Sequence, residues 1–312
     1  MSAALASIVS EIEVELQAPV PPEVRAMADA IVALHGDSVA AILFYGSCLR
    51  DRTTDGILDF YVLIDDYRRY HEKRGQAVFN RLLPPTVALW SLGEGAAKAK
   101  VAVIARDQFA RRMRSASLDT SLWARFCQPA VLVHARDREC ADWTASTLAR
   151  AVVTAAGWAA RLGPATGTAA DYWTALFQQS YGAELRAESG EHRAKALYAA
   201  AADRFDRLLP PALEAAGIAA SRTPDGRLHL RLPPGAVRGQ RSWWLRRATG
   251  KTLNLARLVK AAFTFAGGVE YILWKIERHT GRQVRLTAWQ RRHPLLAAPL
   301  VLWRLRSGRT AL

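Results

Sequence analysis

Two small residues and a carboxylate stand close together in the first quarter of the chain. Gly46 and Ser47 directly follow the apolar run Val39–Tyr45, and Asp59 stands inside the next apolar run, Ile57–Asp65. Because glycine has no Cβ, the backbone at Gly46 can approach a ligand closely, and the amides and hydroxyl that follow can bind phosphate oxygens. A carboxylate on an adjacent strand can hold the Mg²⁺ that bridges those phosphates. Together these residues predict a nucleotidyl-transfer site.

The second metal ligand is less obvious than the first. In the general nucleotidyltransferase signature two carboxylates alternate along one strand and therefore share a face, but here the second position is Tyr61. Asp65 lies roughly 20 Å from Asp59 along an extended strand, which is too far for the two to share one ion. We therefore expect Mg²⁺ on Asp59 with Asp55, from the preceding loop, as second ligand, and Glu184 as the alternative to Asp55.

Further motifs follow in a fixed order along the chain. They are Tyr45-Gly46-Ser47, Asp59-Phe60, Ile64-Asp65-Asp66 with Tyr70-His71, the "KVAVI" of residues 100–104, the "ARFCQP" of residues 124–129, the "SYGAELR" of residues 180–186, and Gly190-Glu191 with Lys195. In this order and spacing the sequence resembles the mitochondrial phosphatidate cytidylyltransferases of the translocator-maintenance type, also called CDP-diacylglycerol synthases. Three positions depart from that family's pattern, namely Tyr70 for Trp, Gln128 for Lys and Glu184 for Asp. The resemblance covers about half the chain and leaves the last hundred or so residues without a counterpart.

The resemblance implies transfer of a cytidylyl group from CTP to phosphatidate, with Mg²⁺ as cofactor and pyrophosphate as the second product. It implies Asp59, Ser47 and Lys100 as catalytic residues. Substrate-binding roles fall on Gly46, Ser47, Arg125, Tyr181, Arg186 and Lys195, with the basic side chains holding triphosphate or phosphatidate. The sequence leaves His71 open between a site residue and a packing residue.

These residues need a sheet to bring them together. The runs "VAAILFY", "ILDFYVLID", "TVALW" and "KVAVIA" are short, apolar and bounded by Gly, Pro or charge, which is typical of strands in one covered sheet. Residues 21–36 begin with prolines, have apolar residues at helical spacing and end in glycine, so they predict an amphipathic helix. The expected fold is α/β (α+β), a nucleotidyltransferase-type mixed sheet with flanking helices.

The pattern changes near residue 140. Residues 141–220 are Ala-rich and predict helices interrupted by "GPATG" and by Pro210-Pro211, followed by a hairpin at "GRLHLRLPPG". A basic helical tail comes last. We therefore expect a nucleotidyltransferase catalytic domain over 1–140, a helical domain that completes the site over 141–235, and a membrane-association tail over 236–312.

Charge is concentrated in that tail. The chain has a formal net charge of +15, and residues 241–312 contain 15 Lys or Arg against two Glu. Such a block attracts nucleic acid or an anionic lipid surface. An apolar run over 294–303, set between arginines, is too short to span a bilayer but suits its interface. With a lipid substrate we expect phosphatidate and an anionic membrane as partners rather than nucleic acid, while a helical cap with a solvated basic face is the alternative for the tail.

The termini and cysteines suggest the compartment. Glu11, Glu13 and Glu15 come before any basic residue, so neither a secretory signal nor a transit peptide is expected, and no apolar run is long enough for a membrane-spanning helix. Three widely spaced cysteines predict neither a disulfide nor a zinc site. We expect a cytoplasmic protein, peripheral on the inner face of a bacterial-type cell membrane.

Three alternatives stay open at this stage. Gly46-Ser47 is also compatible with an ordinary turn and Asp59 with a strand-edge residue. The same fold also suits a nucleotidyltransferase acting on RNA, a protein or a small molecule. The missing second carboxylate also fits a catalytically inactive module that binds nucleotide or lipid. Acyl preference and oligomeric state have no signal in the sequence.

Overall fold

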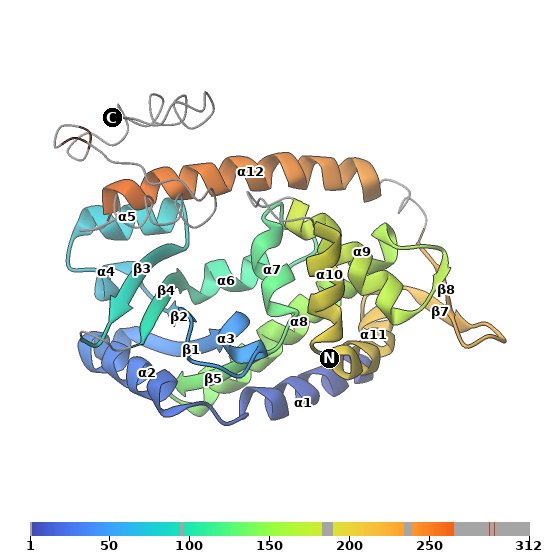
Figure 1. Ribbon diagram of the computed structural model, residues 1–312, viewed down its shortest axis with the longest axis horizontal. Helices are drawn as coiled ribbons and strands as arrows, with labels where there is room; N and C mark the ends of the chain where they lie inside the picture. The colour runs from blue at the N-terminus through green and yellow to red at the C-terminus, as the bar shows by residue number, and fades with distance from the viewer. Residues whose placement is uncertain are drawn as a thin grey trace.

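The computed structural model describes residues 2–93, 97–182, 190–233 and 239–264, together with Thr287 and Gln290. The mixed α/β class expected from the sequence is confirmed, because a five-stranded mixed sheet with helices on both faces forms the first half of the chain (Figure 1). The nucleotidyltransferase type of this fold stays a prediction. The expected boundary after residue 140 falls in the first turn of a long helix, and the boundary after residue 235 lies outside the described residues.

The strands of the main sheet follow the order β3-β4-β2-β1-β5. β2 and β4 are parallel, and the other three neighbouring pairs are antiparallel. Each of the four predicted apolar runs supplies one of the strands β1 to β4. The bounds are β1 Val39–Tyr45, β2 Leu58–Ile64, β3 Thr86–Ser91, β4 Lys98–Ala105 and β5 Ala130–Ala135. All seven residues of β1 are buried, which explains why this strand reads as a continuous apolar run.

Helices cover both faces of this sheet. One face packs against α2 and the short helices that follow β2, around Met27, Ile31, Phe44 and Phe60. The other packs against α1, α6, α7 and α8, around Ile12, Tyr61 and Phe126. The bounds are α1 Ala3–Leu16, α2 Pro22–His35, η1 Gly36–Ser38, α3 Ser47–Arg50, α4 Tyr67–Tyr70, α5 Arg74–Leu82, α6 Arg106–Arg112, α7 Thr120–Phe126 and α8 Arg138–Leu162. The predicted helix over 21–36 is confirmed as α2, with Pro22 in its first turn and Gly36 after its end.

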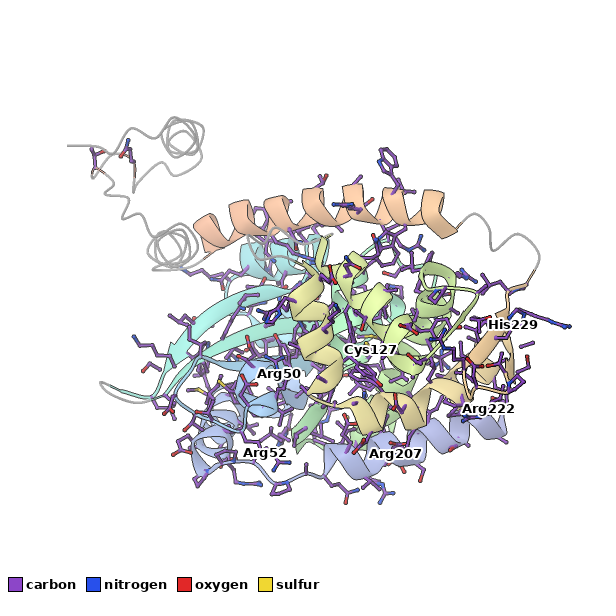
Figure 2. The ribbon with its side chains drawn as sticks, turned by 45° about the vertical axis from the view of Figure 1, so that its right-hand side comes forward. Arg50, Arg52, Cys127, Arg207, Arg222 and His229 are labelled. Carbon is purple, nitrogen blue, oxygen red and sulfur yellow. The ribbon has the colours of Figure 1, made fainter. Side chains whose placement is uncertain are left out.

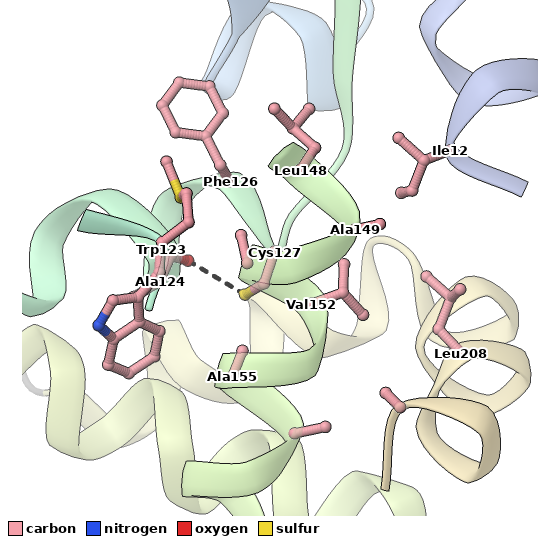
Figure 3. Packing of buried hydrophobic residues seen from close by; sticks show 14 of the residues in the cluster. Ile12, Trp123, Ala124, Phe126, Cys127, Leu148, Ala149, Val152, Ala155 and Leu208 are labelled. Carbon is pink, nitrogen blue, oxygen red and sulfur yellow. Dashed lines mark hydrogen bonds between the residues drawn. The ribbon is translucent and has the colours of Figure 1, made fainter. Parts of the chain in front are cut away.

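The second half of the chain is mainly helical, as predicted. Figure 3 shows Cys127, which follows α7, among apolar residues of α7 and α8, and its thiol donates to the carbonyl of Ala124. The bounds are α9 Ala169–Gly182, α10 Gly190–Ala199 and α11 Ala202–Ala215, with a small second sheet in the order β6-β8-β7 from β6 Thr166–Gly167, β7 Ala219–Arg222 and β8 Leu228–Arg231. Arg222 and His229 of this sheet lie at the periphery, far from the buried Cys127 (Figure 2).

One expectation for this region is wrong. "GPATG" does end a helix, but Pro210 and Pro211 lie inside α11 rather than interrupting it. Each proline removes a backbone hydrogen bond from the helix. The helix persists because its apolar side, including Phe205, Leu208 and Leu213, is buried in the core, and tertiary packing outweighs the lost bonds.

The basic segment begins with a long helix that packs against the first half of the chain. α12 spans Gly239–Thr264 and contacts α7, α8 and β3. Near its end, Lys260 donates to the carbonyls of Leu83 and Pro85 and to the hydroxyl of Thr86. This part of the predicted tail therefore caps the core, and the apolar run over 294–303 lies outside the described residues. None of the helices in the described part of the chain has the length and apolar character of a membrane span.

Candidate functional site

The turn after β1 brings Gly46 against Asp59. Gly46 has a φ of 94°, a conformation that L-residues with a side chain rarely adopt. A Cβ added at Gly46 would lie 2.6 Å from Oδ2 of Asp59, closer than atoms can pack. Only glycine therefore fits here, and Ser47 follows with an exposed side chain as the first residue of α3. The predicted pairing of this turn with the carboxylate on the adjacent strand is confirmed as a close approach.

Asp59 belongs to a row of residues that crosses four strands. In the register of the sheet, Tyr45 of β1 lies beside Asp59, Asp59 beside Lys100 of β4, and Lys100 beside Leu89 of β3. Residues in register on neighbouring strands project from the same face, here the face that packs against α6, α7 and α8. The Nζ atom of Lys100 lies 3.5 Å from Oδ1 of Asp59. The ammonium group of Lys100 and the carboxylate of Asp59 therefore form a partly exposed ion pair.

Arg125 adds a second positive charge to this face. Its guanidinium carbon lies 5.4 Å from the ring centre of Tyr45 and 6.0 Å from that of Tyr61, within the range of cation–π attraction. Tyr61 occupies the position where the general signature has its second carboxylate, and it is fully buried. Burial raises the pKa of the Tyr61 phenol, which stays neutral beneath the guanidinium. The chain thus has a neutral ring where a carboxylate would place a buried charge.

A buried charge network holds α7, which carries Arg125. Asp119 caps the start of α7 by accepting from the backbone N–H of Ser121, and Arg257 of α12 donates to its other oxygen at 2.5 Å. The Nε atom of Arg112 lies 3.5 Å from the same oxygen. Burial raises the pKa of Asp119, but Arg257, Ser121 and Arg112 together outweigh burial, so the pKa lies below its usual value. Asp119 is therefore charged at neutral pH and connects α12 to the helix beside the site.

The other predicted site residues are placed less closely. Asp55 is exposed in the loop before β2 and accepts from the hydroxyl of Thr53. Lys195 lies on α10, where its described partner is Glu191 at 2.8 Å. Tyr181 belongs to the last turn of α9, and its side chain is not among the described parts of the structure. Arg186 and Glu184 lie outside the described residues. Among the described residues, no ion pair joins Lys195 to Asp59.

The donors at this site fit a Mg²⁺ ion held largely by a nucleotide. Mg²⁺ binds one or two carboxylates and completes an octahedron with phosphate oxygens and water. Asp59 supplies one partly exposed carboxylate beside a turn that only glycine can make. No group of three His, Cys, Asp or Glu at metal-binding distances occurs among the residues that the structure describes. Asp55 as second ligand stays a prediction.

His71 is a packing residue. It contacts the rings of Tyr67 and Tyr70, and its Nε2 atom lies 3.0 Å from Nδ2 of Asn80. Tyr67 and Tyr70 belong to the core on the opposite face of the sheet from Asp59. Burial, with smaller contributions from His35 and Lys260, lowers the pKa of His71 to about 4.

Sequence reasoning missed the residues that support the site from a distance. The Asp-Thr-Ser sequence at 119–121 is a helix-start pattern that would have marked Asp119 as a cap. Nothing in the sequence around Arg257 or Lys260 indicates their partners, which lie more than a hundred positions away. α12, which the sequence assigned to the tail, therefore contacts the helix that carries Arg125.

Comparison with known proteins does not identify the chain. No protein-family model matches it, and no curated protein matches it. The assignment of a function therefore has to come from the arrangement of Gly46, Asp59, Lys100 and Arg125 and from the motifs in the sequence.

Proposed function

We propose that this protein is a Mg²⁺-dependent phosphatidate cytidylyltransferase that converts CTP and phosphatidate to CDP-diacylglycerol and pyrophosphate at a membrane surface. The observation that carries the proposal is the close approach of Gly46 to Asp59 with Lys100 at 3.5 Å from the same carboxylate. The order of the sequence motifs supports phosphatidate as the acceptor and CTP as the nucleotide substrate. The described residues contain no separate signal for cytosine.

In the proposed reaction a phosphate oxygen of phosphatidate attacks the α-phosphorus of CTP. The new bond joins that oxygen to the α-phosphorus, and the bond from the α-phosphorus to the bridging oxygen breaks as pyrophosphate leaves. The nucleophile is already an anion, so no strong general base is needed, and rate enhancement comes from alignment and charge neutralisation.

The residues around Asp59 have different roles in this reaction. Gly46 lets the backbone of the turn approach the triphosphate, and the exposed hydroxyl of Ser47 donates to a phosphate oxygen. Lys100 and Arg125 supply positive charge on the face where negative charge develops. Asp59 would hold Mg²⁺, which neutralises the phosphates when bound. Lys195 and Arg186 remain proposed ligands of the phosphate groups.

We also propose that the protein works at the inner face of a bacterial-type cell membrane, as a peripheral protein. The basic segment that begins with α12 is the proposed means of attachment, because phosphatidate is presented within a bilayer.

The test is a turnover assay with purified protein, Mg²⁺ and phosphatidate-containing liposomes, comparing CTP with ATP. CDP-diacylglycerol and pyrophosphate from CTP alone, lost in Asp59→Asn and kept in Asp107→Asn, would support the proposal. Asp107 is a suitable control because its carboxylate forms an exposed pair with Arg111 on α6. Lack of lipid product with wild-type protein would refute the proposal.

The same assay addresses a second candidate, a nucleotide-binding module without activity. The buried Tyr61 at the place of the second carboxylate favours it. Tight binding of Mg²⁺-CTP with no turnover of lipid or RNA would support this candidate, and CTP-dependent labelling of RNA would instead indicate a different acceptor.

A further inference from the structure

One helix next to the catalytic sheet exposes an unusual amount of apolar surface. On α5 the side chains of Val78, Phe79 and Leu82 are 51%, 55% and 73% exposed. They lie within two turns and on neighbouring positions of one helix side, since residues three and four apart are adjacent on a helix surface. The opposite side of α5, with Ala77 and Asn80, is buried against the core. We call Val78, Phe79 and Leu82 the α5 apolar stripe.

The sequence segment that contains this stripe is basic, and the exposed Glu72 directly precedes it. From Lys73 to Gly93 the chain has three basic residues, Lys73, Arg74 and Arg81, and no acidic residue. All three basic side chains are exposed, and none forms an ion pair with another residue in the described part of the chain. An amphipathic helix with an apolar side and flanking bases is the form of segment that lies in the interface of an anionic bilayer.

The C-terminal end of α12 is fixed beside the same helix. Lys260, one turn before the end of α12, donates to the carbonyls of Leu83 and Pro85, immediately after α5. Figure 1 shows α5 directly below the C-terminal end of α12. The described part of α12 therefore ends near the α5 apolar stripe, and 48 residues follow Thr264 in the sequence.

Charge complementarity selects the occupant of this surface. Residues 265–312 contain nine Lys or Arg against two Glu, so packing this segment on α5 would bring like charges together. A second copy of the chain would also bring the same bases into contact. An anionic lipid surface is attractive both to α5 and to the tail.

We propose that the α5 apolar stripe inserts into the interface of an anionic membrane, with Lys73, Arg74 and Arg81 on lipid phosphates. The inference rests on the proposed function in that it takes the membrane to be the source of the acceptor, and it names the surface that meets this membrane. Contact at two places, α5 and the tail, makes attachment stronger than either segment alone.

A local probe tests this contact in the full-length protein. Leu82→Cys and Val14→Cys are each labelled with an environment-sensitive thiol fluorophore, since the native cysteines Cys48, Cys127 and Cys140 are buried. Val14 is a matched control because it is also 73% exposed but lies on α1, which packs against β5 at the other end of the sheet. We expect a blue shift at position 82, and none at 14, on adding vesicles of phosphatidylcholine with phosphatidylglycerol, and no shift with phosphatidylcholine alone.

Other results would overturn the proposal. An unchanged probe at position 82 while the protein co-sediments with vesicles would mean that other segments make the contact. A probe that is already blue-shifted without vesicles would mean that the tail or a second copy covers α5, and sedimentation equilibrium would separate these two cases. Absence of co-sedimentation would exclude the membrane contact altogether.

A pair of substitutions provides an independent readout. Phe79→Asp with Leu82→Asp should reduce vesicle partitioning by about tenfold or more, because two apolar insertions are lost, while Val14→Asp should not change it. Equal partitioning in all three proteins would overturn the inference. These assays contain neither CTP nor phosphatidate, so loss of binding here and lack of turnover in the activity assay are separate failures.

Discussion

Asp59 and Lys100 lie side by side on the parallel strands β2 and β4, with Nζ 3.5 Å from Oδ1, and Gly46 closes against the other oxygen of the same carboxylate. This geometry fixes the carboxylate from two sides and leaves it partly exposed. A phosphate chain placed over this position would meet a cation, a carboxylate and a backbone turn without a side chain. The predictions that follow test these contacts and the network that supports them.

Asp59→Asn should reduce nucleotide turnover by more than about 100-fold, because a neutral amide is a poor Mg²⁺ ligand and even indirect supports of a metal contribute 10–100-fold. The substitution keeps the shape of the side chain, so the free energy of unfolding should change by less than about 1 kcal/mol, as for a pair that is partly solvated. Turnover with phosphatidate liposomes and urea denaturation measure the two effects. Substantial activity in Asp59→Asn would remove this residue from the site.

Gly46→Ala should destabilise the protein and also impair the site. A left-handed conformation costs a non-glycine residue about 1–2 kcal/mol, and the new methyl group would also displace the Asp59 carboxylate. Gly36→Ala is the matched control, because Gly36 has a φ of 53° and no atom within 4 Å of an added Cβ. We expect both variants to lose stability and only Gly46→Ala to lose activity. Equal activity in the two variants would show that the close approach has no functional role.

Asp119→Ala should destabilise the fold by about 3 kcal/mol, because it leaves the partly buried Arg257 and Arg112 without their carboxylate. Asp107→Ala breaks an exposed pair with Arg111 and should cost less than about 1 kcal/mol. Chemical denaturation of both variants measures this difference. If α12 supports the site through Asp119, limited proteolysis should cut α12 faster in Asp119→Ala than in wild type, and equal cleavage rates would contradict that role.

The elements near the site could be read from the sequence, whereas their long-range supports could not. Val39–Tyr45 is apolar throughout because it is buried on both sides, and "GS" followed by Asp59 marks a turn and an adjacent strand. The position of α12 depends on Arg257 and Lys260, which bind a distant carboxylate and the backbone carbonyls of a loop. Every residue has a backbone carbonyl, so the sequence does not indicate which carbonyls accept these hydrogen bonds. Pro210 and Pro211 were misleading because local propensity was outweighed by burial of the helix around them.

His71 should make stability depend on pH in mildly acidic solution. Burial lowers its pKa to about 4 in the folded state, against about 6.5 in an unfolded chain. Below pH 6.5 the unfolded chain therefore binds a proton that the folded protein excludes, so the free energy of unfolding falls as pH decreases from 6.5 to 4 and the full contribution is present only above pH 6.5. In His71→Gln, where the amide can still contact Asn80, this part of the decline should disappear. Urea denaturation of both proteins at pH 7 and pH 4.5 measures the effect. An equal decline in both would assign the acid sensitivity to other groups, such as His35 and His134, whose pKa values burial also lowers.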